Sequence, residues 1–436
     1  MARAMATVTK FVDKTNGNDA NDGLDNIGVG LATATWEEAT LTLTQNGHGY
    51  TFAEGDVIYL ASGTGLTPGL YEVASSTVNT ITLVETSTIP RVGNGSDVAA
   101  GDDATGDWTS SDGPLQTLDA AMNAVVAVND TTFYCRSGAD YGAAAIDIAG
   151  SALSQTITFE GYTTTPGDDG RITMKGALTD TIASRIYYCF KNIIFDAEDA
   201  RANCVSLSSY EIMFRNCDFL SGTGDNCICG QSTWFWNCYF EGSGADGVSC
   251  GTMGAFFNCR FYNNVASGID GSSTAVAWNC TFYNNSAIAF DAAAGNDTHL
   301  IAINCTFDGH ARATNIAVYK NGAFMGMVAV INCIIYDCLT GIDCVSDERD
   351  LLLYNLLNNN NANYDGSASD QEGTFQTGAP DFVNEVGGAD YTLNSASPAV
   401  SAGHDEDNNM DIGSHQRVAG GGGGGLLMPN KRGNKQ

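Results

Sequence analysis

The sequence predicts an all-β solenoid, a column of stacked coils, and three observations predict it. Six segments of the form Asn-Cys-x-Phe, or close variants, follow one another along the middle of the chain, with their asparagines spaced by 21, 21, 21, 25 and 28 residues. A second set of short segments led by Ile or Val runs in phase with the first and alternates apolar with polar side chains, as strands do. The repeats have neither the leucine spacing nor the helical half of a leucine-rich repeat, which has a similar length.

The repeated segments predict ladders of like side chains, because stacking brings equivalent residues to within about 4.8 Å of each other. Asparagine tolerates the left-handed backbone of a sharp corner, and its amide can bond to the asparagine of the next coil. We therefore expect corner residues at Asn216, Asn237, Asn258, Asn279, Asn304 and Asn332. Parallel Cβ vectors fit disulfide geometry poorly, so we expect buried free thiols at Cys217, Cys238, Cys259, Cys280, Cys305 and Cys333. A core ladder of phenylalanines is expected at Phe219, Phe240, Phe261, Phe282 and Phe307.

Three features together resemble a known superfamily. They are the Asn-Cys-x-Phe coils, the segment Asp112-Gly-Pro-Leu-Gln-Thr-Leu-Asp-Ala-Ala121, and Ser397-Pro-Ala-Val-Ser-Ala-Gly403 with the later Asp411-Ile-Gly413. Over residues 110–418 the chain resembles the pectate-lyase-like right-handed parallel β-helix superfamily, in which a short capping helix similar to 112–121 opens many solenoids. The resemblance implies the fold and leaves activity open, because the superfamily includes lyases, hydrolases, epimerases, adhesins and phage spikes.

Four parts are expected along the chain. Residues 1–30 are similar to the strand and polar turn that precede the capping helix. Residues 31–108 separate this part from the helix and form a small inserted β-rich, barrel-like module, which resembles those of phage-type structural proteins. Residues 109–418 are the right-handed parallel β-helix with its N-terminal capping helix. Residues 419–436 are a Gly-rich tether and a basic tail, in which a docking peg would use Leu426, Leu427, Met428, Lys431 and Arg432, the alternative being a frayed terminus.

Composition excludes several classes of partner. Acidic residues outnumber basic ones 50 to 19, giving a formal net charge of −31, which would repel nucleic acid over the whole surface. No stretch of about 18 apolar residues is present, so no membrane span is expected. The first residues have no apolar signal-peptide core, so export by the general secretory route is not expected. The 14 cysteines include no zinc-type CxxC pair.

An enzyme of this superfamily would be expected to carry its chemistry on the outward face of one strand ladder. The outward positions of the Ile/Val register are taken as Ser206, Cys229, Ser249, Asp270, Ala289, Ala317 and Asp343. On this register the two aspartates lie about three coils apart, too far to share a calcium ion or to act as the carboxylate pair of a glycosidase. The remaining weak catalytic candidates are Asp308 and His310, an acid and a base whose Asp-Gly-His sequence is also typical of a turn.

The sequence contains no motif that defines a cofactor, and calcium is the one metal ion considered. Residues 13–25 crowd oxygen ligands into one loop, with Asp13, Asp19, Asp22 and Asp25 as the carboxylates, yet the loop matches no defined calcium motif. The alternative is a solvated cluster of Asx turns.

An aromatic series precedes the corner asparagines, at Trp236, Phe257 and Trp278. Such a series on the outside of a solenoid could bind sugar rings or pack against a neighbouring chain, and we favour the second role. The function expected overall is that of a structural virion surface protein, a phage head decoration, fibre or tailspike-like component made in the host cytoplasm, which docks on other assembly proteins and binds host surface glycans. A homotrimer is expected from the resemblance alone. The alternatives are a polysaccharide lyase or glycoside hydrolase, and an extracellular or cell-surface adhesin.

Overall fold

The structure is a computed structural model, and part of the chain is described here. The described residues are 7–12, 30–37, 41–44, 46, 57–60, 62–63, 69–84, 104–109, 130–138, 140–141, 146–147, 156–164, 166–175, 177–179, 187–198, 202–208, 211–271, 273–292, 299–310, 315–320, 326–344, 351–366, 379–380, 382–384, 390–393 and 396–399. Every regular element among them is a strand, which confirms the all-β class. The capping helix predicted at 112–121 falls outside these residues.

The chain divides into two compact units. The first comprises Met1–Gly142, Ile148–Gly150 and Gln155–Ile172, and the second Ala143–Asp147, Ser151–Ser154 and Thr173–Gln436. The four-part division expected from the sequence stays a prediction.

An antiparallel sheet of seven strands forms the inserted module in the first unit, in the order β4-β6-β7-β3-β2-β8-β5. Its strands are β2 (Gly30–Glu37), β3 (Thr42–Thr44), β4 (Val57–Leu60), β5 (Ser62–Gly63), β6 (Gly69–Ser76), β7 (Thr80–Leu83) and β8 (Ala104–Thr109). Period-2 alternation buries Leu43, Val73 and Ile81 between them. The same unit holds three parallel strands, β1 (Thr7–Val12), β9 (Asp130–Arg136) and β11 (Thr156–Tyr162), in which Phe133 stacks on Phe159.

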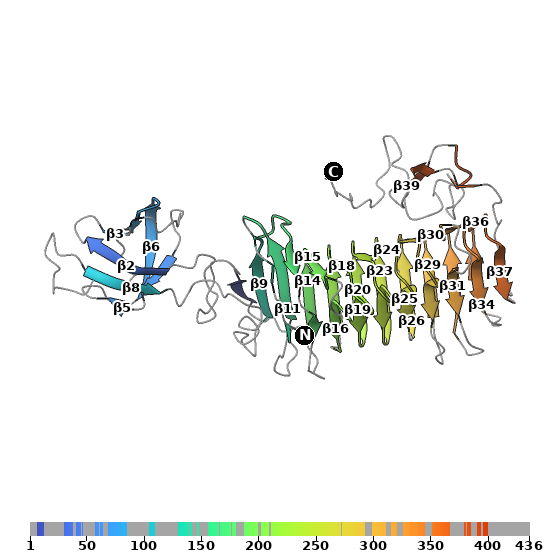
Figure 1. The fold of residues 1–436 in the computed structure, drawn as a ribbon, viewed down its shortest axis with the longest axis horizontal. Helices are drawn as coiled ribbons and strands as arrows, with labels where there is room; N and C mark the ends of the chain where they lie inside the picture. The colour runs from blue at the N-terminus through green and yellow to red at the C-terminus, as the bar shows by residue number, and fades with distance from the viewer. Residues whose placement is uncertain are drawn as a thin grey trace, which may run out of the picture. The chain divides into compact units, whose positions relative to one another are not determined.

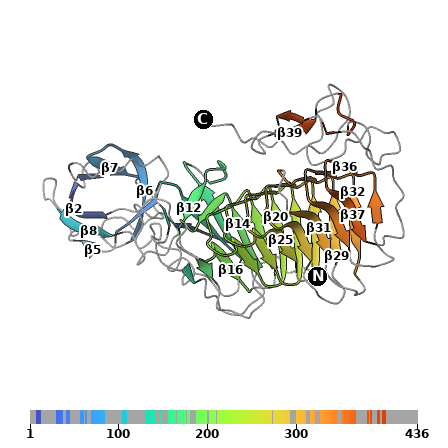
Figure 2. The ribbon, with the colours of Figure 1, turned by 45° about the vertical axis from the view of Figure 1, so that its right-hand side comes forward.

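Three parallel sheets build the second unit, and the chain visits them in turn in every coil (Figure 1, Figure 2). Sheet 1 contains β14 (Tyr187–Lys191), β17 (Glu211–Arg215), β20 (Ser232–Trp236), β23 (Met253–Phe257), β26 (Thr274–Trp278), β29 (His299–Ile303), β32 (Val328–Ile331) and β35 (Leu351–Leu353). Sheet 2 contains β12 (Ile172–Met174), β15 (Ile193–Asp196), β18 (Asp218–Leu220), β21 (Tyr239–Glu241), β24 (Arg260–Tyr262), β27 (Thr281–Tyr283), β30 (Thr306–Asp308), β33 (Ile334–Tyr336) and β36 (Leu356–Asn358). Sheet 3 contains β10 (Ile146–Asp147), β13 (Leu178–Thr179), β16 (Val205–Leu207), β19 (Cys227–Cys229), β22 (Val248–Cys250), β25 (Ser267–Gly271), β28 (Ile288–Ala292), β31 (Ile316–Lys320), β34 (Thr340–Cys344) and β37 (Ala362–Gly366).

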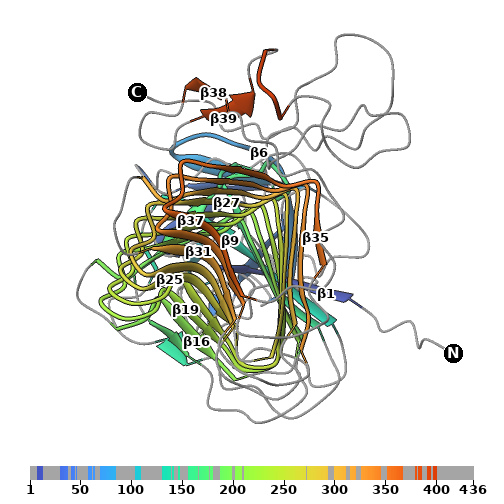
Figure 3. The ribbon, with the colours of Figure 1, turned by 90° about the vertical axis from the view of Figure 1, so that its right-hand side faces the viewer.

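The coil is right-handed. Figure 3 looks along the column from its C-terminal side, and the chain passes from sheet 1 (β35) to sheet 2 (β27) and then to sheet 3 (β31) anticlockwise. Later coils lie nearer the viewer, as the colours show, so the path rises toward the viewer as it turns anticlockwise. The right-handed parallel β-helix predicted from the sequence is confirmed.

A corner asparagine joins sheet 1 to sheet 2 in six successive coils. Asn216, Asn237, Asn258, Asn279, Asn304 and Asn332 all have φ between 52° and 57°. The side chains also bond along the column, because Nδ2 of Asn237 donates to Oδ1 of Asn216 at 3.2 Å, and Nδ2 of Asn258 donates to Oδ1 of Asn237 at 3.3 Å. The ladder stops at Asn279, whose Oδ1 is buried without a hydrogen-bond partner and which precedes the first coil longer than 21 residues.

Aromatic rings fill the core as two stacked columns. Phe240, Phe261 and Phe282 in sheet 2 stack with centroids 4.8 Å apart and interplanar angles of 2° and 8°. Phe235 and Phe256 in sheet 1 stack in the same way at 4.8 Å. Rings of the two columns meet edge to face, and all five side chains are fully buried.

The cysteines are free thiols inside the core. All 14 are buried, and none of them forms a disulfide. Each Sγ in the ladder after the corner asparagine lies near two backbone carbonyls; that of Cys238, for example, lies 3.6 Å from the oxygen of Phe214 and 3.4 Å from that of Trp236. Burial raises the pKa of the Cys238, Cys280 and Cys333 thiols well above the ordinary value. These thiols therefore act as small apolar fillers rather than as nucleophiles.

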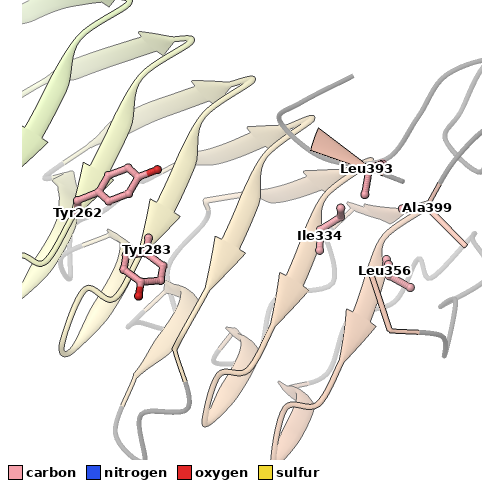
Figure 4. Packing of buried hydrophobic residues seen from close by; sticks show 6 residues of the cluster. All are labelled: Tyr262, Tyr283, Ile334, Leu356, Leu393 and Ala399. Atoms are coloured by element: carbon pink, nitrogen blue, oxygen red, sulfur yellow. The ribbon is translucent and has the colours of Figure 1, made fainter. Parts of the chain in front are cut away.

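The C-terminal part of the second unit covers part of the outer face of sheet 2. It contains the antiparallel pair β38 (Phe382–Asn384) and β39 (Asp390–Leu393). Leu393 and Ala399 pack in one buried cluster with the outward side chains of Ile334 and Leu356 (Figure 4).

Candidate functional site

The outer face of sheet 3 carries a row of carboxylates that the sequence register did not bring together. Asp270 pairs with Asp291 on the next coil, Asp291 with Tyr319, and Tyr319 with Asp343. Neighbouring strands place Asp270 and Asp291 at a spacing of about 4.8 Å. We call Asp270, Asp291, Tyr319 and Asp343 the acidic strip.

Three outward positions taken from the sequence are corrected by the pairing. Asp291, not Ala289, is level with Asp270, because Phe290 rather than Ile288 pairs with the core residue Ile269. Tyr319, not Ala317, is level with Asp343, because Val318 pairs with Ile342. Ile228, not Cys229, stands between Ser206 and Ser249, and the two cysteines on either side of it point into the core. The face therefore carries a row of carboxylates on neighbouring coils, which the register taken from the sequence did not predict.

Burial raises the pKa of two carboxyl groups in this region. Desolvation, together with the charges of Asp246 and Asp225, raises the pKa of Asp270 to about 6, and desolvation also raises the pKa of Asp246. Oδ1 of Asp270 is buried without a hydrogen-bond partner. Asp246 lies just before β22, and its Oδ1 accepts a hydrogen bond from the backbone N–H of Ser267 at 2.6 Å.

The arrangement can supply an acid and a base. A carboxyl whose pKa is raised, beside a second carboxyl on the next coil, resembles the pair that glycoside hydrolysis uses. Burial, followed by the charges of Asp343 and Asp291, also raises the pKa of Tyr319, so its phenol stays protonated and can donate a hydrogen bond. In the described part of the chain, no group of three His, Cys, Asp or Glu side chains is placed to hold a metal ion. The calcium candidates Asp13, Asp19, Asp22 and Asp25 fall outside the described residues.

Asp308 and His310 lie at the end of β30 in a tight turn. The backbone N–H of His310 donates to Oδ1 of Asp308 at 2.7 Å, and His310 has φ of 52°. Asp308 is 6% exposed, and the His310 ring lies 5.1 Å from that of Tyr283. This geometry is that of an Asx turn, which favours the structural reading of the Asp-Gly-His sequence.

The aromatic series lies on the outer face of sheet 1, in one column of paired positions. Trp236 pairs with Phe257, and Phe257 with Trp278. The rings of Trp236 and Phe257 stack at 5.0 Å with an interplanar angle of 13°, so each covers a face of the other. The role of the series, whether it binds sugar rings or packs against a neighbouring chain, stays a prediction.

The aromatic series is part of a larger apolar surface that sequence reasoning missed. A second outward column runs beside it, two residues earlier in each strand, and both columns continue as aliphatic side chains beyond Trp278. We call the whole surface the apolar face; its members are Trp234, Trp236, Ala255, Phe257, Val276, Trp278, Ile301, Ile303, Ala329, Ile331, Leu351 and Leu353. Trp278 is 46% exposed. The sequence signal that could have revealed this surface is an apolar residue at both the third and the fifth position of β20, β23, β26 and β29.

The docking tail proposed at Leu426, Leu427, Met428, Lys431 and Arg432 falls outside the described residues. The described residues contain no helix that could cross a membrane.

Comparison with known proteins gives structural similarities only. No protein-family model matches the sequence, and no curated protein matches it. Among solved structures the chain is similar to pectate lyase Pel9A, with 15% identity, 72% of this chain and 93% of that chain covered, and a TM-score of 0.35. It is also similar to the tailspike protein gp49 from Pseudomonas phage LKA1, with 11% identity, 86% of this chain and 70% of that chain covered, and a TM-score of 0.24.

The strand pairing establishes the fold independently of these similarities. The chain is a right-handed parallel β-helix. This is the fold that the resemblance to the pectate-lyase-like superfamily implies.

Proposed function

We propose that this β-helix is a structural component of a virion surface, a head decoration, fibre or tailspike-like protein that is built into a larger assembly. The observation that carries the proposal is the apolar face, which runs along successive coils of sheet 1 and is larger than scattered surface residues require. The core supports a rigid role, because phenylalanine rings stack on one another from coil to coil and the cysteines are buried among them. Glycan binding on the host surface, a homotrimeric state and docking through residues 419–436 belong to the same proposal.

Particle composition tests this function. Gradient-purified particles from the source culture are analysed by mass spectrometry for a fixed ratio of this chain to a major capsid protein. A fixed, high copy number supports the proposal. Absence from particles, with the chain found free or on cells, refutes it and favours an extracellular or cell-surface protein.

Deletion of residues 420–436 tests the docking tail separately. We expect the truncated chain to fold with an unchanged urea midpoint and to be lost from particles. Normal incorporation of the truncated chain removes the docking tail from the proposal and leaves the virion role in place.

The acidic strip favours a second candidate, a hydrolase of an extracellular polysaccharide. Asp270, with its raised pKa, would act as the general acid, and Asp291 on the adjacent coil as the second carboxyl of the pair. A lyase is less well supported, because neither a calcium group nor a basic residue accompanies these carboxylates at the paired positions of the strip.

Depolymerisation of a polysaccharide panel tests this candidate with matched variants. We expect Asp270→Asn and Asp291→Asn each to lower the rate at least a hundredfold, and Asp343→Asn, two coils away from Asp291, to leave it within a few-fold. Loss of activity in Asp308→Ala with full activity in Asp270→Asn would place the chemistry at the Asx turn instead. No depolymerisation of any panel member, with or without calcium, removes the enzyme reading.

A further inference from the structure

Two core thiols lie on one short strand within reach of a covalent bond. Cys227 and Cys229 are the first and last residues of β19, and both side chains point into the core. Their Sγ atoms are 3.3 Å apart, close enough for one thiol to donate a hydrogen bond to the other. The corner cysteines differ, because each of them has its counterpart in the ladder at least 21 residues away, on another coil.

We propose that Cys227 and Cys229 form a redox-sensitive switch in the column. As two thiols they let β19 pair with the coils on either side of it, and as a disulfide they keep this coil open. The inference goes beyond the proposed function, because it concerns the stability of the column and applies to a virion component and to a hydrolase alike.

The geometry of a strand explains why the disulfide opens the coil. Residues two apart in a strand have Cα atoms about 6.7 Å apart, whereas disulfides usually join Cα atoms about 5.5–6 Å apart and rarely more than about 6.8 Å. The strand must therefore shorten by about 1 Å while the Sγ atoms close from 3.3 Å to about 2.05 Å. A shortened β19 loses its register with β16 and β22, so the disulfide and the closed coil exclude each other.

The closed coil protects the two thiols from oxidation. Cys227 is fully buried and Cys229 is 1% exposed. Burial raises the pKa of the Cys227 thiol well above its ordinary value, and the hydrogen bond with Cys229 acts in the same direction. Because the thiolate is the reactive form of cysteine, oxidation waits until this coil opens.

The sequence around β19 favours local opening of this coil. The strand has only three residues; Gly224 lies in the turn before it, and Gly230 follows it directly. Both glycines allow close approach of neighbouring coils, since a Cβ would lie 2.9 Å from the backbone oxygen of Ala202 at the first and 2.9 Å from Cα of Ser208 at the second. Glycine also gains the most conformational freedom on unfolding, so this coil opens at a lower free-energy cost than the whole column.

The oxidation balances with a small disulfide as the oxidant, such as oxidised glutathione. In the open coil one thiolate attacks the small disulfide, which releases one glutathione and leaves a mixed disulfide on the protein. The second thiolate attacks the protein sulfur of this mixed disulfide, forms the bond between Cys227 and Cys229, and releases the second glutathione. Two electrons pass from the protein to the oxidant, and the two thiol protons end on the glutathione sulfurs. Because the product is strained, an excess of thiol reverses the reaction.

Mass spectrometry of the folded full chain tests the inference. The chain is incubated with oxidised glutathione, the remaining thiols are alkylated, and the cysteine peptides are followed with time. We expect the peptide with Cys227 and Cys229 to lose two hydrogens about tenfold faster than any other cysteine peptide reacts. The oxidised chain should have a lower urea midpoint and about tenfold faster hydrogen exchange in β16, β19 and β22, and dithiothreitol should restore both.

Matched variants separate the pair from the other thiols. Cys229→Ala removes the pair, so the oxidant should leave its urea midpoint unchanged. Cys250→Ala is the control, because Cys250 is the paired position on the next coil, is also 1% exposed, and leaves the pair intact. It should lose stability on oxidation as the unmodified chain does. Circular dichroism under reducing conditions shows that each variant is folded, and the valine variant replaces an alanine variant that is not.

Four results would overturn the inference. They are a folded chain in which the pair keeps both thiols, oxidation of other cysteines before this pair, an oxidised pair with an unchanged urea midpoint and unchanged hydrogen exchange, and an equal loss of stability on oxidation in Cys229→Ala and in the unmodified chain.

Discussion

Replacing one corner asparagine should show how much of the stability comes from the amide ladder and how much from the left-handed backbone. Asn237 has φ of 54° and makes two side-chain bonds, one as donor to Asn216 and one as acceptor from Asn258. Asn237→Gly keeps the backbone unstrained and removes both bonds, each worth about 1 kcal/mol, and adds about 0.7 kcal/mol from the greater freedom of the unfolded chain. We expect a loss of about 2.5–3 kcal/mol in the free energy of unfolding.

Asn237→Ala removes the same two bonds and forces a residue with a Cβ into the left-handed region, at a cost of about 1–2 kcal/mol. We expect it to be about 0.5–1 kcal/mol less stable than the glycine variant. Urea denaturation followed by far-ultraviolet circular dichroism measures all variants. The matched control is Asn263→Gly, because Asn263 has φ of 56° and accepts a ladder bond from Asn284 but is exposed.

The exposed ladder competes with water, so Asn263→Gly should cost about 1 kcal/mol. An equal cost at the two positions would refute the reasoning that the two part-buried bonds of Asn237 contribute more than the one exposed bond of Asn263. A glycine variant at Asn237 less stable than the alanine variant would refute the reasoning about the left-handed corner.

Three further perturbations follow from the core and the acidic strip. The folded state raises the pKa of Asp270 to about 6, so its neutral form is favoured by folding; this contribution is present below the unfolded pKa near 4 and is lost as pH rises through about 6. Asp270→Asn should therefore stabilise the fold at pH 8 by about 1 kcal/mol, after solvent screening is allowed for, and by much less at pH 4, and urea midpoints that shift equally at both pH values would contradict this. Phe261→Ala opens a cavity in the ring column and should cost about 3–5 kcal/mol in urea unfolding, against about 1–2 for Phe261→Leu, and similar costs would mean that the column collapses around the gap. Thr233→Val removes a fully buried hydroxyl that has no hydrogen-bond partner and should raise the unfolding free energy by about 1 kcal/mol; a loss would show that the hydroxyl has a partner.

The fold could be predicted from the sequence because the repeat combines a conformational and a chemical signal at one position. Asn followed by Cys marks a left-handed corner and the first core residue after it, and this pair recurs in six coils. The antiparallel module was predictable in part, since β3 and β7 alternate buried and less buried residues.

The acidic strip could not be predicted from the alternation of apolar and polar residues. Alternation fixes the face of the sheet on which a side chain lies, but it does not fix which residue of the next coil it pairs with. In β28 both Ile288 and Phe290 lie on the core side of the alternation, and matching the first of them to Ile269 shifts the register by two residues. That shift replaced Asp291 by Ala289 and removed the carboxylate from the row. In β19 three apolar residues follow one another, so even the facing was ambiguous.

The apolar face was predictable in part. Trp236, Phe257 and Trp278 stand out because aromatic residues are rare on an outer face, whereas the aliphatic continuation through Ile303 and Ile331 reads as ordinary core sequence. Only the pairing of the strands shows that both sides of sheet 1 are apolar.

The identical coil length between Asn216 and Asn279 has a consequence for how this molecule could change over evolutionary time. Removal or duplication of 21 residues in this region would set Asn on Asn, Cys on Cys and Phe on Phe again, so a recombination event would leave the contacts across the new junction of the same kind. The column would become shorter or longer by about 4.8 Å per event. The length of the column can therefore change in fixed steps by recombination, and each change keeps the same kind of core.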